Sequence, residues 1–225
     1  MISYSFIEGN IIDCRSDELP DNLVGAAMVS NKDGSHHAAI FIRYNGNSHV
    51  FHFTGKQVLM EDVWSIDEVY YHVGLNIINP ILLPSFQAQC ELILEKAEPK
   101  FGYFYTGAVY NESGDFVSPN DFPQYMTCVG FCLSTISGFL SDSIFFNFED
   151  WDDALIDETF VERFLEKVKA ENPEVDTTSF KENIRRILPI DYMSGAFSMT
   201  TPITKSFVDQ IKTDVLVAFQ KKQVA

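Results

Sequence analysis

HHAAIFIRYNGNSHVFHFTG, residues 36–55, contains the clearest local signal in this chain of 225 residues. Two runs rich in β-branched and aromatic residues flank Asn45-Gly46, a dipeptide that favours a two-residue hairpin turn because both residues tolerate positive φ. Such a turn fixes the register of the hairpin and sets Tyr44 opposite Asn47. The stretch therefore predicts two paired antiparallel strands.

Four of the five histidines of the chain lie in this hairpin. Side chains alternate between the two faces of a strand, so the predicted register places His37 and His52 on one face as diagonal neighbours, roughly 7–8 Å apart at the backbone. His36 and His49 point to the other face. Two imidazoles on one face suit a general base and the group that orients it. A register shifted by one residue would exchange His52 for His49, and a polar strand face without a catalytic role is the other interpretation.

A second stretch, QYMTCVGFCLSTISGFL at residues 124–140, places two cysteines four residues apart in an apolar run. The run predicts a helix over residues 127–139 with Thr127 as its N-cap. The amides and dipole of a helix N-terminus favour a thiolate, so we expect Cys128, in the first turn, to be a nucleophile with a lowered pKa. Cys132 lies one turn deeper. The alternative is that both cysteines are small buried core residues.

Patterns elsewhere predict further strands and, in the second half of the chain, mostly helices. We interpret residues 1–150 as an α+β core and residues 151–225 as a helical extension packed on it. The expected elements are strands at 23–31 and 65–73, a helix at 85–97 with Ser85 as N-cap, a long loop at 103–125, and helices at 157–172, 177–188 and 201–222.

Composition limits the classes of partner. The formal net charge of −16 disfavours nucleic acid and anionic membranes, because long-range electrostatics would be repulsive. No run approaches the 18 apolar residues of a membrane helix, and the N-terminus lacks a secretory signal pattern. We expect a cytoplasmic protein, with delivery elsewhere by a dedicated system left open, and free thiols. The cysteines are Cys14, Cys90, Cys128 and Cys132.

Together the two stretches resemble the NlpC-type, papain-like cysteine peptidases. CVGFC, residues 128–132, is similar to the cysteine-serine-glycine-aliphatic start of the catalytic helix of that family, although Val129 replaces the usual serine. The hairpin is similar to the histidine strand of the family and the strand that follows it. Here the histidine strand precedes the cysteine by about ninety residues. That order resembles the circularly permuted branch, which includes bacterial YiiX-like proteins and lecithin retinol acyltransferase-like enzymes.

The resemblance covers roughly residues 8–140 and implies a permuted papain-like α+β core, with an antiparallel sheet packed on the cysteine helix. It implies a cysteine hydrolase that acts on an amide bond of the peptide or peptidoglycan-stem type, without metal or cofactor. Cys128 would form an acyl-enzyme, His37 would be the general base and His52 its orienting partner. The Cys128 N–H and a tyrosine would hold the oxyanion. The tyrosine candidates are Tyr103, Tyr105 and Tyr125.

Three alternatives stay open. The chain could be a binding module with a degenerate site on the same fold, or an acyltransferase acting on a lipid. A metal site built from Cys128, Cys132 and hairpin histidines is the third, since thiolate and imidazole are zinc ligands. The sequence identifies neither the substrate nor the oligomeric state.

Overall fold

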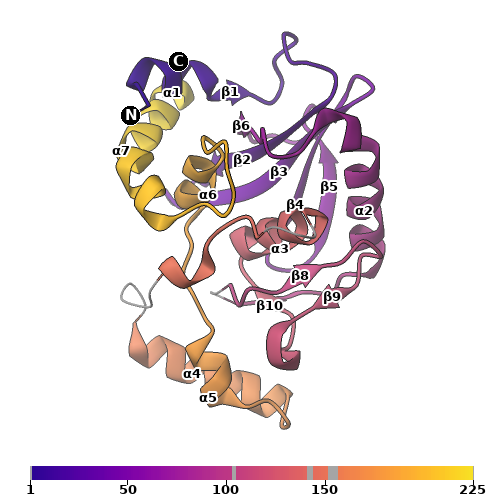
Figure 1. Cartoon of the computed structure of the whole chain (residues 1–225), viewed down its shortest axis with the longest axis vertical. Coiled ribbons are helices and arrows are strands. Elements are labelled where there is room, and N and C mark those ends of the chain that lie inside the picture. The colour runs from indigo at the N-terminus through magenta and orange to yellow at the C-terminus, as the bar shows by residue number, and fades with distance from the viewer. Residues whose placement is uncertain (1, 103–104, 141–143, 152–156, 225) are drawn as a thin grey trace.

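A six-stranded sheet, antiparallel throughout, lies at the centre of the fold in the order β1-β6-β2-β3-β4-β5 (Figure 1). Its strands are β1 Ile12–Asp13, β2 Leu23–Ser30, β3 His36–Tyr44, β4 Asn47–Phe53, β5 Val58–Asp62 and β6 Tyr71–Gly74. The computed structural model describes residues 2–102, 105–140, 144–151 and 157–224. The fold is thus mixed α and β with an antiparallel sheet, as the sequence predicts at that level.

The β3–β4 hairpin has the predicted register. Tyr44 pairs with Asn47, and the paired ladder runs back to Ile40 opposite Phe51. The two turn residues have φ of 51° and 78°, the left-handed values that a two-residue turn of this kind requires. Because this turn allows one register, it also determines which side chains of β3 and β4 share a face.

Most of the helices cover one face of the sheet, and one pair lies apart from it. Their bounds are α1 Tyr4–Asn10, α2 Leu83–Lys96, α3 Cys128–Leu140, α4 Glu158–Glu171, α5 Thr177–Glu182, α6 Pro189–Gly195 and α7 Lys205–Gln223. The prediction that the cysteine helix packs on the hairpin is confirmed, because the Phe131 ring of α3 lies 5.0 Å from the Phe51 ring and 6.4 Å from the Phe53 ring. The helix also bears the predicted cap, since the Gly130 N–H donates to Thr127 Oγ1 at 2.9 Å.

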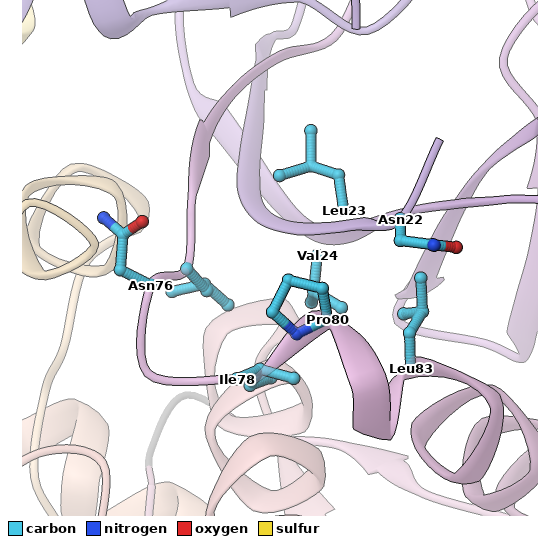
Figure 2. Close-up of a pocket in the computed structure, with 8 residues that line it drawn as sticks. Asn22, Leu23, Val24, Asn76, Ile78, Pro80 and Leu83 are labelled. Carbon is cyan, nitrogen blue, oxygen red and sulfur yellow. The ribbon is translucent and has the colours of Figure 1, made fainter. Parts of the chain in front are cut away.

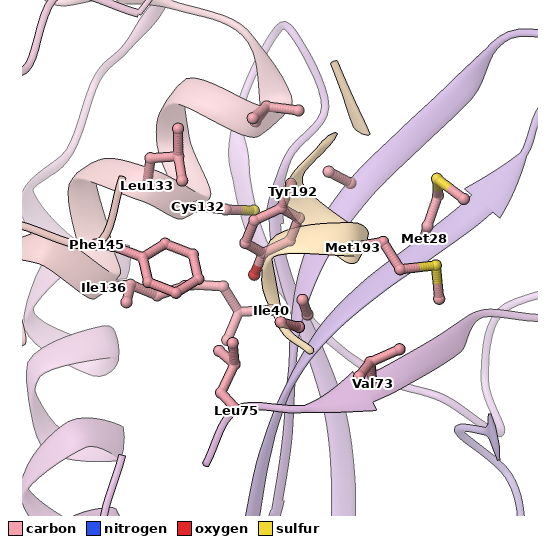
Figure 3. Close-up of a cluster of buried hydrophobic side chains, with 14 of the residues drawn as sticks. Met28, Ile40, Val73, Leu75, Cys132, Leu133, Ile136, Phe145, Tyr192 and Met193 are labelled. Atoms are coloured by element: carbon pink, nitrogen blue, oxygen red, sulfur yellow. The ribbon is translucent and has the colours of Figure 1, made fainter. Parts of the chain in front are cut away.

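Two of the C-terminal helices belong to this same core. Figure 3 shows Tyr192 and Met193 of α6 next to Cys132 of α3 and to strand residues such as Ile40. The last helix, α7, adds Phe219 to the same buried cluster. Residues 151–225 were predicted to form one helical extension. In the structure, α6 and α7 instead form part of the main core over the sheet.

The α4–α5 pair lies apart from the sheet (Figure 1). It forms a separate small core in which Phe164 and Phe180 pack with Phe122 and Tyr125, two residues that precede α3 in the chain. Tyr125 also donates a hydrogen bond from its hydroxyl to Glu171 at 2.6 Å. This pair is therefore anchored to the segment that leads into the cysteine helix.

The opposite face of the sheet is covered by connecting segments. Cys14, Phe41 and Tyr70 belong to the small buried cluster on this face. His72 is 1% exposed there, with its Nδ1 3.6 Å from the Cys14 sulfur and its ring 4.4 Å from the Phe41 ring. Burial lowers the pKa of His72 to about 4.

Several element boundaries differ from the sequence prediction. The second helix begins at Leu83, so Ser85 lies inside it and is not its N-cap. Strand 65–73 begins only at Tyr71, and helix 177–188 ends at Glu182. Helices α1 and α6 and strand β5 were not predicted.

The predicted loop 103–125 includes short elements in its described part. They are β8 Val109–Tyr110, β9 Phe116–Val117, a 3-10 turn Pro119–Asp121 and the start of β10 Tyr125–Met126. Strand β10 pairs with β7 Lys100–Phe101.

Within the described ranges, no helix is long and apolar enough to cross a membrane.

We expect Gly138→Ala to destabilise the protein strongly, because a Cβ at Gly138 would lie 1.7 Å from the backbone oxygen of Tyr110. The backbones of α3 and β8 would have to separate, at a cost on the order of 3 kcal/mol of unfolding free energy. Gly9→Ala is the matched control, since Gly9 is also helical and a Cβ there meets nothing within 4 Å. The control should gain about 0.5–1 kcal/mol. Urea unfolding measures both, and equal stabilities would contradict the close α3–β8 contact.

We expect the free energy of unfolding to fall as the pH drops from 6.5 towards 4. The buried His72 stays neutral down to its lowered pKa of about 4, whereas the unfolded chain takes up that proton near pH 6.5. The stabilisation is complete above pH 6.5, and up to about 3 kcal/mol of it is lost on acidification. Urea unfolding at several pH values should give a shallower pH dependence for His72→Gln. Parallel curves for the two proteins would count against a buried neutral His72.

Candidate active site

A chain of three hydrogen-bonded side chains lies at the end of the hairpin, where β3 begins and β4 ends. His37 Nε2 lies 2.8 Å from His52 Nδ1, and His52 Nε2 lies 2.7 Å from Glu61 Oε2. The sequence predicted that the two histidines share a face, and they meet directly. Glu61 was not predicted. It lies on β5, which pairs with β4 so that Val50 is opposite Glu61.

The order of donors and acceptors in this chain follows from the carboxylate at its end. A carboxylate only accepts hydrogen bonds, so Nε2 of His52 donates to Glu61. A neutral His52 then accepts at Nδ1, and Nε2 of His37 is the donor to it. A neutral His37 accordingly has its lone pair on Nδ1. This assignment follows from the hydrogen-bond network. It leaves Nδ1 of His37 as the basic nitrogen at the end of the Glu61–His52–His37 series.

Burial keeps both imidazoles neutral at pH 7. It lowers the pKa of His37 to about 4, with the neighbouring His52 adding to the effect. Burial also lowers the pKa of His52, although its hydrogen bond to Glu61 and the charges of Glu61 and Glu68 oppose this. A neutral His37 can accept a proton, which is the resting state that a general base needs.

Cys128 is the first residue of α3, and its pKa differs from the sequence expectation. The N–H groups of Ala38, Val129 and Cys128 itself and the charge of Arg186 all lower the pKa of the thiol. Burial is the largest effect and acts in the opposite direction, so the pKa is raised. The resting group is therefore a thiol.

Cys128 and His37 lie on opposite faces at the end of the sheet. Cys128 packs with the cluster on the helix-covered face, whereas strand alternation puts His37 on the face of Phe41. The sulfur faces the Ala38 N–H, which belongs to the residue after His37 and lies beyond the paired part of the β3–β4 ladder. In the described part of the chain, no hydrogen bond joins Cys128 to His37 or His52. Catalytic hydrogen bonds are often long before a substrate binds.

An open pocket of about 530 Å³ lies beside the histidine pair, and His37, His52, Glu61 and Tyr70 line part of it. Tyr70 is 6% exposed, and its ring centroid lies 6.2 Å from that of His52. Burial and the charges of Glu61, Glu68 and Cys128 raise the pKa of Tyr70, so its hydroxyl stays protonated. Within the described ranges this hydroxyl has no hydrogen-bond partner. It is a hydrogen-bond donor at the wall of the pocket.

Two of the three tyrosines expected to hold an oxyanion have hydrogen-bond partners elsewhere in the structure. Tyr105 is within hydrogen-bonding range of Ser137, which lies nine residues after Cys128 and so about 13 Å along α3. Tyr125 is bound to Glu171. Tyr103 lies outside the described residues. Local sequence reasoning favoured tyrosines nearer to the cysteine in the chain, whereas Tyr70 lies in the segment just before β6 and lines the pocket with His37 and His52.

A small cavity and a buried Cys–His pair lie elsewhere in the structure. A cavity of about 100 Å³ lies near the start of α2, lined by aliphatic residues and two asparagine amides without an acid or base among them (Figure 2). The Cys14–His72 pair is fully buried. In the described part of the chain, no three His, Cys, Asp or Glu side chains are grouped so that they could hold a metal ion.

No protein-family model, curated protein or solved structure matches this chain. The case for a function therefore rests on the geometry of this site.

We expect Cys128 to be alkylated before the other three cysteines in the native protein. It alone is partly exposed, whereas Cys14, Cys90 and Cys132 are buried. Its labelling rate should continue to rise above pH 9, because only the thiolate reacts and burial raises its pKa above 9.0. Iodoacetamide labelling against pH, read by mass spectrometry, measures this. Cys128→Ser should remove the fast phase, and a rate that levels off near pH 7 would contradict the raised pKa.

Proposed function

We propose that this protein is a cysteine-dependent hydrolase that cleaves an amide bond through an acyl-enzyme on Cys128. The observation that supports this most directly is the Glu61–His52–His37 chain, which leaves Nδ1 of His37 as a base beside the segment that faces the thiol. A nucleophile, a base and a group that orients the base are the three parts of such a site.

The first half of the reaction follows from the protonation states. As the Cys128 sulfur attacks the carbonyl carbon, Nδ1 of His37 takes the thiol proton. Transfer accompanies attack, because both groups are neutral at rest. The imidazolium that forms is stabilised through His52 by the charge of Glu61. His37 then gives the proton to the leaving nitrogen, and the amine departs from the thioester.

The second half hydrolyses the thioester. Water gives a proton to His37 and attacks the carbonyl, and the thiol is regenerated as the acid leaves. In both halves the negative oxygen needs donors. The Cys128 N–H at the start of α3 and the Tyr70 hydroxyl are the donors that we assign to it.

The packing of the cysteine helix on the histidine hairpin is compatible with the proposal. The permuted papain-like arrangement requires a histidine hairpin that precedes the cysteine helix in sequence and packs against it. In this chain α3 packs on β3 and β4 through Phe131. On this basis we assign the fold to the permuted NlpC-type group and the substrate to amides of peptides or peptidoglycan stems. Acyl transfer on a lipid would use the same Cys128 and His37.

A binding module on the same fold is the second candidate. The raised pKa of Cys128 and the missing hydrogen bond between Cys128 and His37 in the described structure favour it. The two candidates differ in one observable, because only the hydrolase forms a covalent acyl adduct on Cys128.

We expect His52→Ala to slow acylation by about 10²–10⁴-fold, because His37 loses the acceptor that fixes its tautomer. His49→Ala is the matched control. His49 lies three residues away in the same strand but on the opposite face, paired with Asp62. The measurement is release of 4-nitrophenol from 4-nitrophenyl acetate, with the adduct located by mass spectrometry. Cys128→Ala and His37→Ala define the background rate.

Three results would change the assignment. A larger loss in His49→Ala than in His52→Ala would show that the working histidine pair is misassigned. If acylation falls to the background rate in His37→Ala but stays at the wild-type rate in His52→Ala and His49→Ala, the site is a Cys–His dyad without a third member. Unchanged rates in His37→Ala and His52→Ala would leave the binding module as the better description.

A further inference from the structure

The start of α3 carries two thiols that lie one helical turn apart and differ in exposure. Cys128 is the first residue of the helix and is partly exposed, whereas Cys132 is fully buried in the cluster over the sheet (Figure 3). Cys14 and Cys90 are also buried and lie outside α3. An oxidant in solution can therefore reach the sulfur of Cys128, while the thiol one turn below it is shielded.

Helical spacing brings these two side chains to the same face of α3. Residues four apart in an α-helix have Cα atoms about 6 Å apart, within the range of roughly 4.4–6.8 Å that a disulfide spans. Their Cβ atoms are about 5–6 Å apart, so they must approach by about 1–2 Å to be bridged. Burial raises the pKa of the Cys132 thiol, and the charge of Cys128 adds to this effect, as expected for neighbouring sulfur atoms.

The first turn of α3 can supply this movement. The residues before the helix belong to β10, which is extended, and the first N–H groups of a helix have no partner within it. Moving Cys128 therefore disturbs little beyond its own carbonyl bond to the Cys132 N–H and the Thr127 cap on the Gly130 N–H. Gly130 lies between the two cysteines and gives this turn the greatest backbone freedom.

We propose that Cys128 and Cys132 form an oxidative modification site, at which a hydroperoxide converts the two thiols into a reversible disulfide. The Cys128 thiolate attacks a peroxide oxygen, the O–O bond breaks, and Cys128 becomes a sulfenic acid while the hydroperoxide is reduced to an alcohol, or to water in the case of hydrogen peroxide. The Cys132 sulfur then attacks the sulfenic sulfur. The S–S bond forms, and the hydroxyl group leaves with the thiol proton as water.

This inference goes beyond the proposed function and does not depend on it. In the disulfide the Cys128 sulfur cannot attack a carbonyl carbon, so an amide-cleaving site would be inactive until a thiol reductant restores it. The nearby Cys132 also protects Cys128 from irreversible oxidation to sulfinic and sulfonic acids. Only the thiolate reacts, and burial raises the pKa of Cys128, so the oxidation should become faster as the pH rises.

The test maps the oxidation products of the native protein. After treatment with hydrogen peroxide, free thiols are alkylated under denaturing conditions, and chymotrypsin cleaves after Phe131, between the two cysteines. Mass spectrometry without reductant should find the Cys128–Cys132 disulfide as the main product, and dithiothreitol should restore labelling of Cys128 by iodoacetamide. In Cys132→Ala, sulfinic and sulfonic acids at Cys128 should be at least about tenfold more abundant than in the wild type, and labelling should not recover.

The matched control is Cys90→Ala, which removes an equally buried thiol from α2 and should behave like the wild type. Equal amounts of sulfinic acid in the wild type and Cys132→Ala, or a main disulfide that includes Cys14 or Cys90, would overturn the modification site. If Cys132→Ala does not fold, the linkage map and the recovery of labelling in the wild type still decide. A disulfide that forms in a protein without acylation activity would support this site and count against the hydrolase alone.

Discussion

The register of the β3–β4 hairpin is the constraint on which the site depends. Positive φ at Asn45 and Gly46 gives a two-residue turn, and this turn sets Tyr44 opposite Asn47. Every later pairing follows in steps of one residue, so His37 and His52 emerge on one face. The same alternation sends Phe51 and Phe53 to the other face, where Phe131 anchors α3. One turn thus aligns both the histidine chain and the helix that begins with the cysteine.

The protonation state of the site is decided by competition between a helix end and burial. A helix N-terminus contributes about 0.3–1 kcal/mol to an anion, which is less than one pKa unit. Burial can shift a pKa by about 3–5 units in the direction of the neutral form. Burial therefore prevails at Cys128, whose pKa is raised, and at His37, whose pKa is lowered to about 4. The result is a neutral thiol at Cys128 and a neutral imidazole at His37.

The two faces of the sheet are covered by different kinds of element. Helices cover one face with an apolar core, to which the C-terminal α6 and α7 contribute residues. The other face is covered by connecting segments, and the one that Arg15 holds forms a wall of the pocket beside His37 and His52. Cys128 packs on the first face, whereas His37 lies on the second, beyond the end of the β3–β4 pairing.

The sequence alone determined the local parts: the turn, the register, the shared face of His37 and His52, and the Thr127 cap that starts the cysteine helix. These follow from φ preferences, strand alternation and capping, which act over a few residues. Tertiary structure decided the rest. It brought Glu61, on a strand that the sequence did not predict, to His52, and it placed Tyr70 at the wall of the same pocket. It also raised the pKa of Cys128, because burial depends on segments distant in the chain whose packing no local pattern encodes.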